Sequence, residues 1–119
     1  MSHDPNCIFC RIAAGEIPAQ KVHEDDELIA FKDIRPAAPV HLLIIPREHI
    51  ATLADAEPRH QALLGRMALL ATKLAREHGA DNGFRTVINT GPDGGQEVYH
   101  IHMHLLGGRP LGPMLAHKG

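Results

Sequence analysis

Aromatic residues are scarce in this 119-residue chain, which contains no tryptophan, one tyrosine and three phenylalanines. A core built from this sequence must therefore be mainly aliphatic. The length is that of one ordinary domain. We expect a single domain over residues 1–119, with a flexible N-terminus at 1–6 and an irregular C-terminal tail at 109–119.

The features of several other protein classes are also missing. The only cysteines, Cys7 and Cys10, lie too close together to suggest a disulfide framework, and a reducing, cytoplasmic location is expected. No basic segment followed by an apolar one marks a secretory signal at the N-terminus. The net charge is -2 without a basic block, so we expect no nucleic-acid partner. No apolar run approaches membrane-spanning length, so we expect no membrane partner.

The spacing of apolar residues predicts two helices and five strands. The longer helix, at about 58–78, carries an apolar stripe with a period of 3.6 residues. The predicted short helix is 7–14, and the predicted strands are 21–23, 28–31, 40–45, 84–89 and 99–106. Because short connections join strands that are close in sequence, we expect an α+β domain with a five-stranded, mainly antiparallel sheet.

Histidine is abundant, with ten residues, and His100, His102 and His104 fall at alternate positions. On a strand these three side chains share one face, while Ile101 and Met103 between them face the core. Neighbours on that face are roughly 6.7 Å apart, so a straight row of three is poorly placed to bind one metal ion. The histidines can instead divide the work along a groove, where one attacks and a neighbour contacts the same phosphate.

A glycine-rich turn, Gly94 to Val98, precedes the histidine run. Its backbone N–H groups are not shielded by bulky side chains, and such groups bind anions and stabilise the negative charge of a transition state. An imidazole beside such a turn indicates phosphorus chemistry. Neutral His102 would attack phosphorus, and water would then hydrolyse the phospho-histidine. Packing or surface roles for these histidines are the alternative.

The run His100-Ile-His102-Met-His104-Leu-Leu resembles the motif of the histidine triad family. Three further segments, 33–46, 94–99 and 107–114, are similar to the bacterial Hint branch, the histidine triad nucleotide-binding proteins, and the resemblance extends from Ile8 to about His117. It implies a homodimer in which two five-stranded sheets join into one ten-stranded sheet. It also implies hydrolysis of purine nucleoside phosphoramidates, such as adenosine 5′-phosphoramidate and AMP joined to lysine, to AMP and an amine.

The same resemblance implies catalytic roles for three histidines. His102 is the nucleophile that becomes nucleotidylated. His104 contacts the phosphate and is the candidate to deliver a proton to the leaving amine. His41, on a neighbouring strand, sets the protonation and orientation of His102. No cofactor is expected to be required for catalysis.

Substrate contacts are implied in the same way for AMP, GMP or their phosphoramidates. Asp33 would bind the ribose hydroxyls, although a carboxylate after a strand can instead cap a turn. The implied phosphate contacts are Asn89 and the backbone of Gly95, Gln96, Glu97 and Val98. The implied base contacts, each of which could also be plain core, are Ile8, Phe9, Ile12, Phe31, Ile34 and Leu43. Some Hint proteins carry Ser in place of Glu97, whose carboxylate would repel a phosphate unless it points away.

Cys7 and Cys10 have the spacing of a zinc-ligand pair, and two further ligands are needed. The resemblance to some bacterial members of the wider superfamily implies His49 and His100 as these ligands, in a structural site that would pin the N-terminal helix to the sheet. Two free thiols and two hydrogen-bonded histidines are the alternative.

Two other functions are compatible with the family resemblance. One is a related enzyme that cleaves dinucleoside polyphosphates or transfers nucleotides, and the tail from Arg109 onward favours the Hint branch over it. The other is a non-catalytic nucleotide-binding or interaction protein. The presence of the middle histidine, His102, favours an enzyme.

Overall fold

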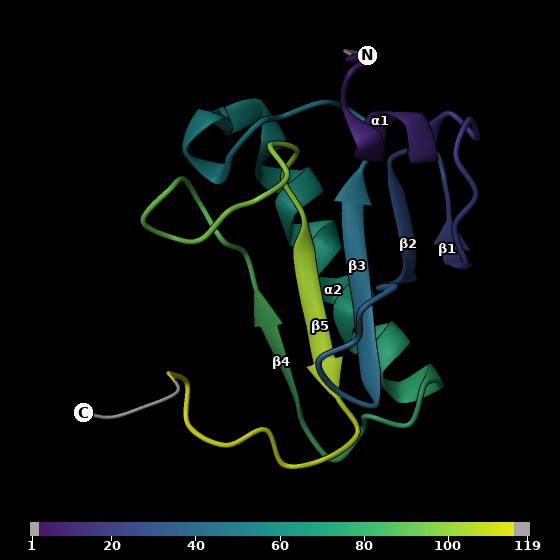
Figure 1. Cartoon of the computed structure of the whole chain (residues 1–119), viewed down its shortest axis with the longest axis vertical. Helices are drawn as coiled ribbons and strands as arrows, with labels where there is room; N and C mark the ends of the chain where they lie inside the picture. The colour runs from purple at the N-terminus through teal and green to yellow at the C-terminus, as the bar shows by residue number, and fades with distance from the viewer. Residues whose placement is uncertain (1–2, 116–119) are drawn as a thin grey trace.

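The computed structural model describes residues 3–115. Its elements are helix α1 (Ile8–Ala13), strands β1 (Lys21–Glu24), β2 (Leu28–Lys32) and β3 (Val40–Pro46), two 3-10 turns (Leu53–Asp55 and Pro58–His60), helix α2 (Gln61–Glu77), and strands β4 (Phe84–Val87) and β5 (Met103–Gly107). The strands form one antiparallel sheet in the order β1-β2-β3-β5-β4 (Figure 1). The predicted α+β class and five-stranded antiparallel sheet are therefore confirmed. Within residues 3–115, neither helix combines the length and apolarity that crossing a membrane requires.

The two faces of the sheet are covered unequally. The larger cluster joins α2 to one face, where Met67 and Leu74 pack with residues such as Leu42 and Leu105. As predicted, its large side chains are aliphatic. On the other face α1 lies over one end of the sheet (Figure 1) and contributes Phe9 to a smaller cluster. Because α1 has only six residues, much of this second face is left for polar side chains.

Local signals in the sequence account for the ends of both helices. Cys7 caps the start of α1, where its Sγ accepts a hydrogen bond from the N–H of Cys10. The helix is followed by Gly15 at φ 79, a backbone conformation that glycine adopts without strain. The predicted long helix is divided at its start, because the turn at Pro58–His60 precedes α2. There Glu57 and His60 form a capping box.

The last predicted strand, 99–106, is too long at its start. Strand β5 begins at Met103, and residues 99–102 have irregular backbone. The N–H of Ile101 donates to the carbonyl of Ile50 at 2.7 Å, which takes the place of a strand partner. The predicted alternation of faces is nevertheless confirmed. Ile101 and Met103 are buried on the α2 side, whereas the rings of His100 and His102 contact Phe9 on the opposite side.

The remaining boundaries differ less. Strand β4 ends at Val87, two residues before the predicted end at Asn89. Within the predicted C-terminal tail, residues 109–115 contain no helix or strand. Residues 1–2 and 116–119, which belong to the predicted N-terminus and tail, lie outside the described residues.

Candidate functional site

The predicted catalytic histidines come together on the face of the sheet that carries α1. His104 on β5 is paired with Leu43 on β3, so His41, two residues before Leu43, is its diagonal neighbour on the same face. The ring centroids of His41 and His104 are 5.2 Å apart, and those of His102 and His104 are 5.1 Å apart. The imidazoles of His41 on β3, His104 on β5 and His102 just before β5 therefore form one contiguous row.

The hydrogen bond of His102 determines which of its nitrogens carries the proton. Nδ1 lies 2.8 Å from the carbonyl oxygen of His100. Since a carbonyl only accepts, Nδ1 is the protonated nitrogen and Nε2 of the neutral ring holds a free lone pair. Nε2 has no hydrogen-bond partner within residues 3–115, and every fully buried side-chain nitrogen or oxygen there has one. Although the residue is only 7% exposed, Nε2 is therefore accessible and has the character of a nucleophile.

A second chain of hydrogen bonds fixes the tautomer of His104. The backbone N–H of Ala37 donates to Nδ1 of His41 at 3.0 Å, so the proton of a neutral His41 lies on Nε2. That nitrogen is 2.9 Å from Nδ1 of His104, which must accept. His104 consequently carries its own proton on Nε2. The row thus offers a bare nitrogen on His102 and an N–H on His104.

Burial keeps the rings of His41 and His104 neutral near pH 7. Desolvation lowers the pKa of His104 to about 4, with smaller contributions from the charges of His102 and His41. Desolvation also lowers the pKa of His41, although the carboxylate of Asp33 opposes this effect. The tautomers of His41 and His104 derived above therefore describe the protein near pH 7.

Asp33 directly follows β2, and each of its carboxylate oxygens makes a different contact. Oδ1 accepts the N–H of Arg35 at 2.7 Å, which is the turn-capping role. Oδ2 lies 3.4 Å from Nε2 of His41. Asp33 and His41 also line a pocket of about 400 Å³. The turn cap is therefore observed, and the ribose contact of Asp33 stays a prediction.

The glycine-rich turn offers fewer free amides than its sequence indicates. The N–H of Gly95 donates to Pro92 and that of Gln96 to Gly91, both at 3.1 Å. The amides of Glu97 and Val98 have no acceptor within residues 3–115. Among the predicted phosphate contacts at Gly95 to Val98, the amides left for an anion are therefore these two, and the Glu97 side chain is exposed to solvent.

Asn89 lies beside the same turn. Its Nδ2 donates to the carbonyl of Gly94 at 2.8 Å, which leaves one N–H of the amide for another partner. Asn89 can therefore fix the turn and contact an anion at the same time.

The predicted base-binding residues divide into two groups. Four of them are buried in the cluster beneath α1, namely Phe9, Ile12, Phe31 and Leu43. The ring of Phe9 packs edge-on against Phe31, with centroids 5.7 Å apart, and against His102 at 5.1 Å. The other two, Ile8 at 47% and Ile34 at 93% exposure, lie at the surface. The buried group therefore contacts the histidine row through the ring of Phe9.

The four predicted metal ligands also come together. Nδ1 of His100 lies 3.3 Å from the sulfur of Cys7 and 3.5 Å from that of Cys10, and Nδ1 of His49 lies 3.3 Å from Cys10. All four ligand atoms lie within 4.8 Å of one another. Nε2 of His100 donates to the carbonyl of Pro46 at 2.8 Å, which leaves Nδ1 unprotonated and facing the sulfurs. Two thiols and two imidazoles in this arrangement fit a tetrahedral zinc ion.

The protonation of this cluster also follows from its burial. Desolvation raises the pKa of the Cys10 thiol to about 11 and lowers the pKa of His100 to about 4. Cys10 is therefore a neutral thiol near pH 7 and must lose its proton when it binds a metal. Both cysteines are free of disulfides.

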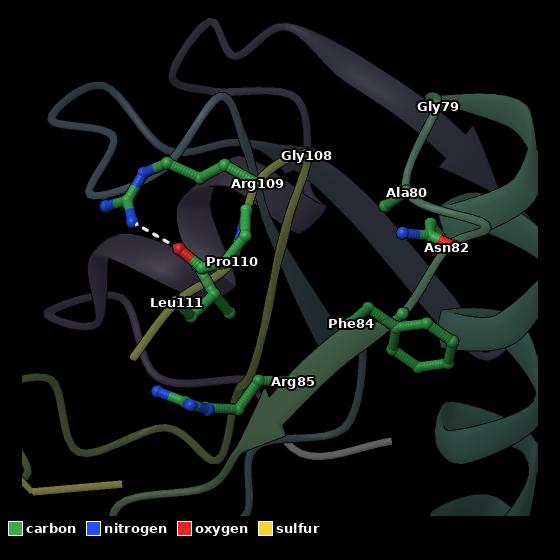
Figure 2. Close-up of a pocket in the computed structure, with 10 residues that line it drawn as sticks. Gly79, Ala80, Asn82, Phe84, Arg85, Gly108, Arg109, Pro110 and Leu111 are labelled. Carbon is green, nitrogen blue, oxygen red and sulfur yellow. Dashed lines mark hydrogen bonds between the residues drawn. The ribbon is translucent and has the colours of Figure 1, made fainter. Parts of the chain in front are cut away.

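A separate pocket of about 530 Å³ lies where the start of β4 meets the tail (Figure 2). Phe84, Arg85 and Arg109 line it, and none of the predicted site residues does. Both arginines donate to backbone carbonyls, Arg85 to Gly112 and Arg109 to Pro110. This pocket is therefore distinct from the histidine row.

Comparison with known proteins agrees with this geometry. A family model described as scavenger mRNA decapping enzyme C-term binding matches residues 6–118. The chain is 59% identical to Protein HitA of Neisseria gonorrhoeae over 102 residues, which cover 86% of this chain and 95% of that protein. It is 57% identical to the purine nucleoside phosphoramidase of Escherichia coli K12 over 113 residues, covering 94% and 95%. The chain belongs to the histidine triad family.

Solved structures of the histidine triad family have the same fold. A HIT family hydrolase from Legionella pneumophila superposes with a TM-score of 0.88 at 55% identity, covering 90% of this chain and 96% of that one. A histidine triad protein from Clostridium difficile gives 0.92 at 43% identity, covering 96% and 100%.

Two relatives carry zinc in their names. A zinc-bound histidine triad family protein from Mycobacterium smegmatis has a TM-score of 0.77 at 36% identity, covering 93% of this chain and 80% of that one. A 14 kDa zinc-binding protein from Brassica juncea is 51% identical over 106 residues, covering 87% and 94%. Zinc binding therefore occurs among proteins close to this chain.

Several groups that shape the histidine triad site are not recognisable in the sequence. The Ala37 amide orients His41, and the carbonyls of Pro46 and Ile50 hold His100 and Ile101. These are backbone groups, and no residue type marks them. Gln96 is different, because a side-chain amide within a glycine-rich turn is a sequence signal for a group that anchors the turn.

We expect the free energy of unfolding to fall as the pH decreases from about 6.5 towards 4, in part because of His104. Its folded pKa is about 4, against 6.5 for an ordinary histidine. The unfolded chain therefore binds the proton first, so this contribution is complete above about pH 6.5 and is lost below it. Urea unfolding at about pH 7 and about pH 5 measures the change. His104→Asn is the control and should lose less stability, whereas an equal loss in both proteins would contradict the assignment.

Proposed function

We propose that this protein hydrolyses the P–N bond of purine nucleoside 5′-phosphoramidates, of the AMP-NH2 or AMP-lysine type, through a nucleotidyl-histidine intermediate. The single observation that carries the proposal is the tautomer of His102, whose Nδ1 donates to a carbonyl and whose Nε2 is bare. The name of the Escherichia coli relative supports the same reaction and substrate class. That name favours phosphoramidates over dinucleoside polyphosphates as substrates. The presence of His102 favours an enzyme over a protein that only binds nucleotides.

The reaction takes two displacements at phosphorus. In the first, Nε2 of His102 bonds to phosphorus and the P–N bond to the amine breaks, so the amine nitrogen keeps the electron pair and takes up a proton. In the second, water attacks phosphorus, the bond to Nε2 breaks, and AMP leaves with the regenerated imidazole. While His102 is nucleotidylated its ring bears a positive charge, which the carbonyl of His100 stabilises through Nδ1–H.

His104 would give its Nε2 proton to the leaving amine in the first displacement and would regain a proton from the attacking water in the second, while His41 stays hydrogen-bonded to its Nδ1. The N–H at Nε2 of His104 points a proton at the phosphoryl group or the leaving nitrogen, because Nδ1 is engaged by His41. The Ala37 amide holds His41 in the tautomer that this arrangement needs. With the ring protons placed in this way, His102 is the proposed nucleophile and His104 the proposed proton donor.

The substrate contacts follow from the same arrangement. Asp33 would accept hydrogen bonds from the ribose hydroxyls through Oδ2, and the amides of Glu97 and Val98 with Asn89 would hold the phosphate. The buried group around Phe9 would pack against a purine, either adenine or guanine, with Ile8 and Ile34 at its edge.

We further propose a homodimer with a continuous ten-stranded sheet. In the order of the described sheet, β4 is an edge strand, whose backbone groups are available for pairing with another copy. Leu69 on α2 and Phe84 on β4 are exposed apolar side chains that such an interface would cover. The free thiols fit a reducing compartment, which supports a cytoplasmic location.

A structural zinc ion is the proposed ligand of the Cys7, Cys10, His49 and His100 cluster. Bound there, zinc would supply a cross-link between α1 and the residues before β5. The nucleophile, the proton donor and the phosphate contacts come from other side chains, so the proposed reaction needs no cofactor.

Replacing the nucleophile tests the proposed reaction. We expect His102→Ala to lower phosphoramidate turnover by roughly a thousandfold or more, because no other group can form the intermediate. AMP binding should survive, since the phosphate and ribose contacts remain. His23→Ala is a matched control, because His23 lies on edge strand β1 and pairs with Asp25. Equal turnover by His102→Ala and the wild type would refute the mechanism.

Asp33 is tested by comparing substrates that differ at the ribose. We expect Asp33→Ala to raise KM for the ribonucleotide by about tenfold or more, because hydrogen bonds to a charged acceptor are lost. KM for a 2′,3′-dideoxy substrate should be the same in variant and wild type. Asp33→Asn keeps an acceptor for the Arg35 amide and so separates the turn cap from the ribose contact. An unchanged ribonucleotide KM would count against this role.

The metal proposal is tested on protein purified without added metal. Elemental analysis should find about one equivalent of zinc per chain, and Cys10→Ser should lose most of it because one thiolate is removed. His23→Ala should retain the metal and controls for handling. Less than about a tenth of an equivalent in the wild type would end the zinc proposal.

A further inference from the structure

The side chain of Gln96 is a buried polar group to which the proposed reaction assigns no task. It is 7% exposed. Its Oε1 accepts the N–H of Gly91 at 2.9 Å, and its Nε2 donates to the carbonyls of Ala51 at 2.8 Å and Val98 at 3.0 Å. Both N–H groups of the amide are therefore used within the protein, so this side chain has no donor left for a substrate phosphate.

These three bonds close the glycine-rich turn on itself. Gly91 lies three residues before the turn and Val98 at its end, and the Gln96 side chain joins the two. The backbone N–H of Gln96 adds a bond to the carbonyl of Gly91 at 3.1 Å. The turn therefore has a fixed shape, and among its last four N–H groups those of Glu97 and Val98 have no acceptor within residues 3–115.

The bond from Gln96 to Ala51 also fixes where this turn lies. The adjacent carbonyl, that of Ile50, accepts the N–H of Ile101 at 2.7 Å, and Ile101 lies between His100 and His102. Two successive carbonyls of one segment thus hold the turn and the start of the histidine run. The distance between the turn and the nucleophile is consequently set by a single stretch of backbone.

Packing also connects the glycine-rich turn to the histidine run. Val98 packs partly buried against the cluster that contains Phe9, and the ring of Phe9 contacts His102. The end of the turn therefore lies on the same face of the sheet as the nucleophile.

We propose that Gln96 is a positioning residue for the nucleotide phosphate: it holds the amides of Glu97 and Val98 at the distance from His102 that in-line attack requires. The role in attack rests on the proposed function, whereas the role in phosphate binding does not. Small displacements of a reacting group are costly, since a shift of about 1 Å can lower a rate roughly a hundredfold.

Two substitutions of nearly equal size separate the polar role from packing. Gln96→Glu can still accept from the Gly91 amide, but its carboxylate cannot donate to the Ala51 and Val98 carbonyls. Gln96→Met fills the space and forms none of the three bonds. We expect both variants to bind AMP about tenfold or more weakly and to bind adenosine, which lacks a phosphate, as the wild type does. The rate of His102 nucleotidylation in a single turnover should fall roughly a hundredfold.

The binding data alone decide the positioning role. Isothermal or NMR titration with AMP and adenosine requires no turnover, so the inference is tested even if the wild type hydrolyses no phosphoramidate. An equal loss of affinity for both ligands would indicate general damage and would overturn the proposal. Unchanged AMP affinity in both variants would overturn it as well.

A measurement on the wild type covers the case in which neither variant folds. Amide NMR signals of Glu97 and Val98 should shift with AMP and not with adenosine, because only AMP brings a phosphate to them. The Gly95 and Gln96 amides donate within the turn and should shift much less. Equal shifts with both ligands, or the largest phosphate-dependent shifts at Gly95 and Gln96, would contradict the arrangement on which the proposal depends.

Discussion

The proposed reaction depends on the hydrogen bond from Nδ1 of His102 to the carbonyl of His100. This bond places the ring proton away from the accessible nitrogen, and without it either tautomer of a neutral imidazole would be available. In the His100 ring, Nδ1 faces the thiols of Cys7 and Cys10, and Nε2 donates to the carbonyl of Pro46. One residue thus orients the proposed nucleophile with its backbone and completes the proposed metal-ligand set with its side chain.

This bond depends on a departure from regular strand structure. In a continuous β ladder, the carbonyl of His100 would point to a neighbouring strand. Residues 99–102 are irregular instead, and the carbonyl of Ile50 holds the N–H of Ile101, so the His100 carbonyl is available to a ring two residues further on. The error in the predicted start of β5 and the tautomer of the nucleophile therefore have the same structural cause.

Periodicity made the fold and the two faces predictable, because the side chains of Ile101 to Leu105 alternate whether or not the ladder is complete. The bonds that tune the site could not be predicted in this way. Ala37, Ile50 and Ala51 act through backbone groups that every residue type supplies, and only the tertiary structure brings them to His41, Ile101 and Gln96. The family resemblance predicted which histidines act, whereas the positions of their protons depend on hydrogen bonds that only the folded structure brings together.

One face of the sheet carries most of the aliphatic core, and the other carries the proposed site. The face under α2 is aliphatic, and it can stabilise the fold without desolvating a titratable group. The face under α1 buries imidazoles and thiols, which costs free energy unless each polar atom is bonded. Within residues 3–115, every fully buried side-chain nitrogen and oxygen has a partner. The same desolvation keeps His104 neutral, so the cost of burying the site is also what supplies the protonation state that the proposed reaction requires.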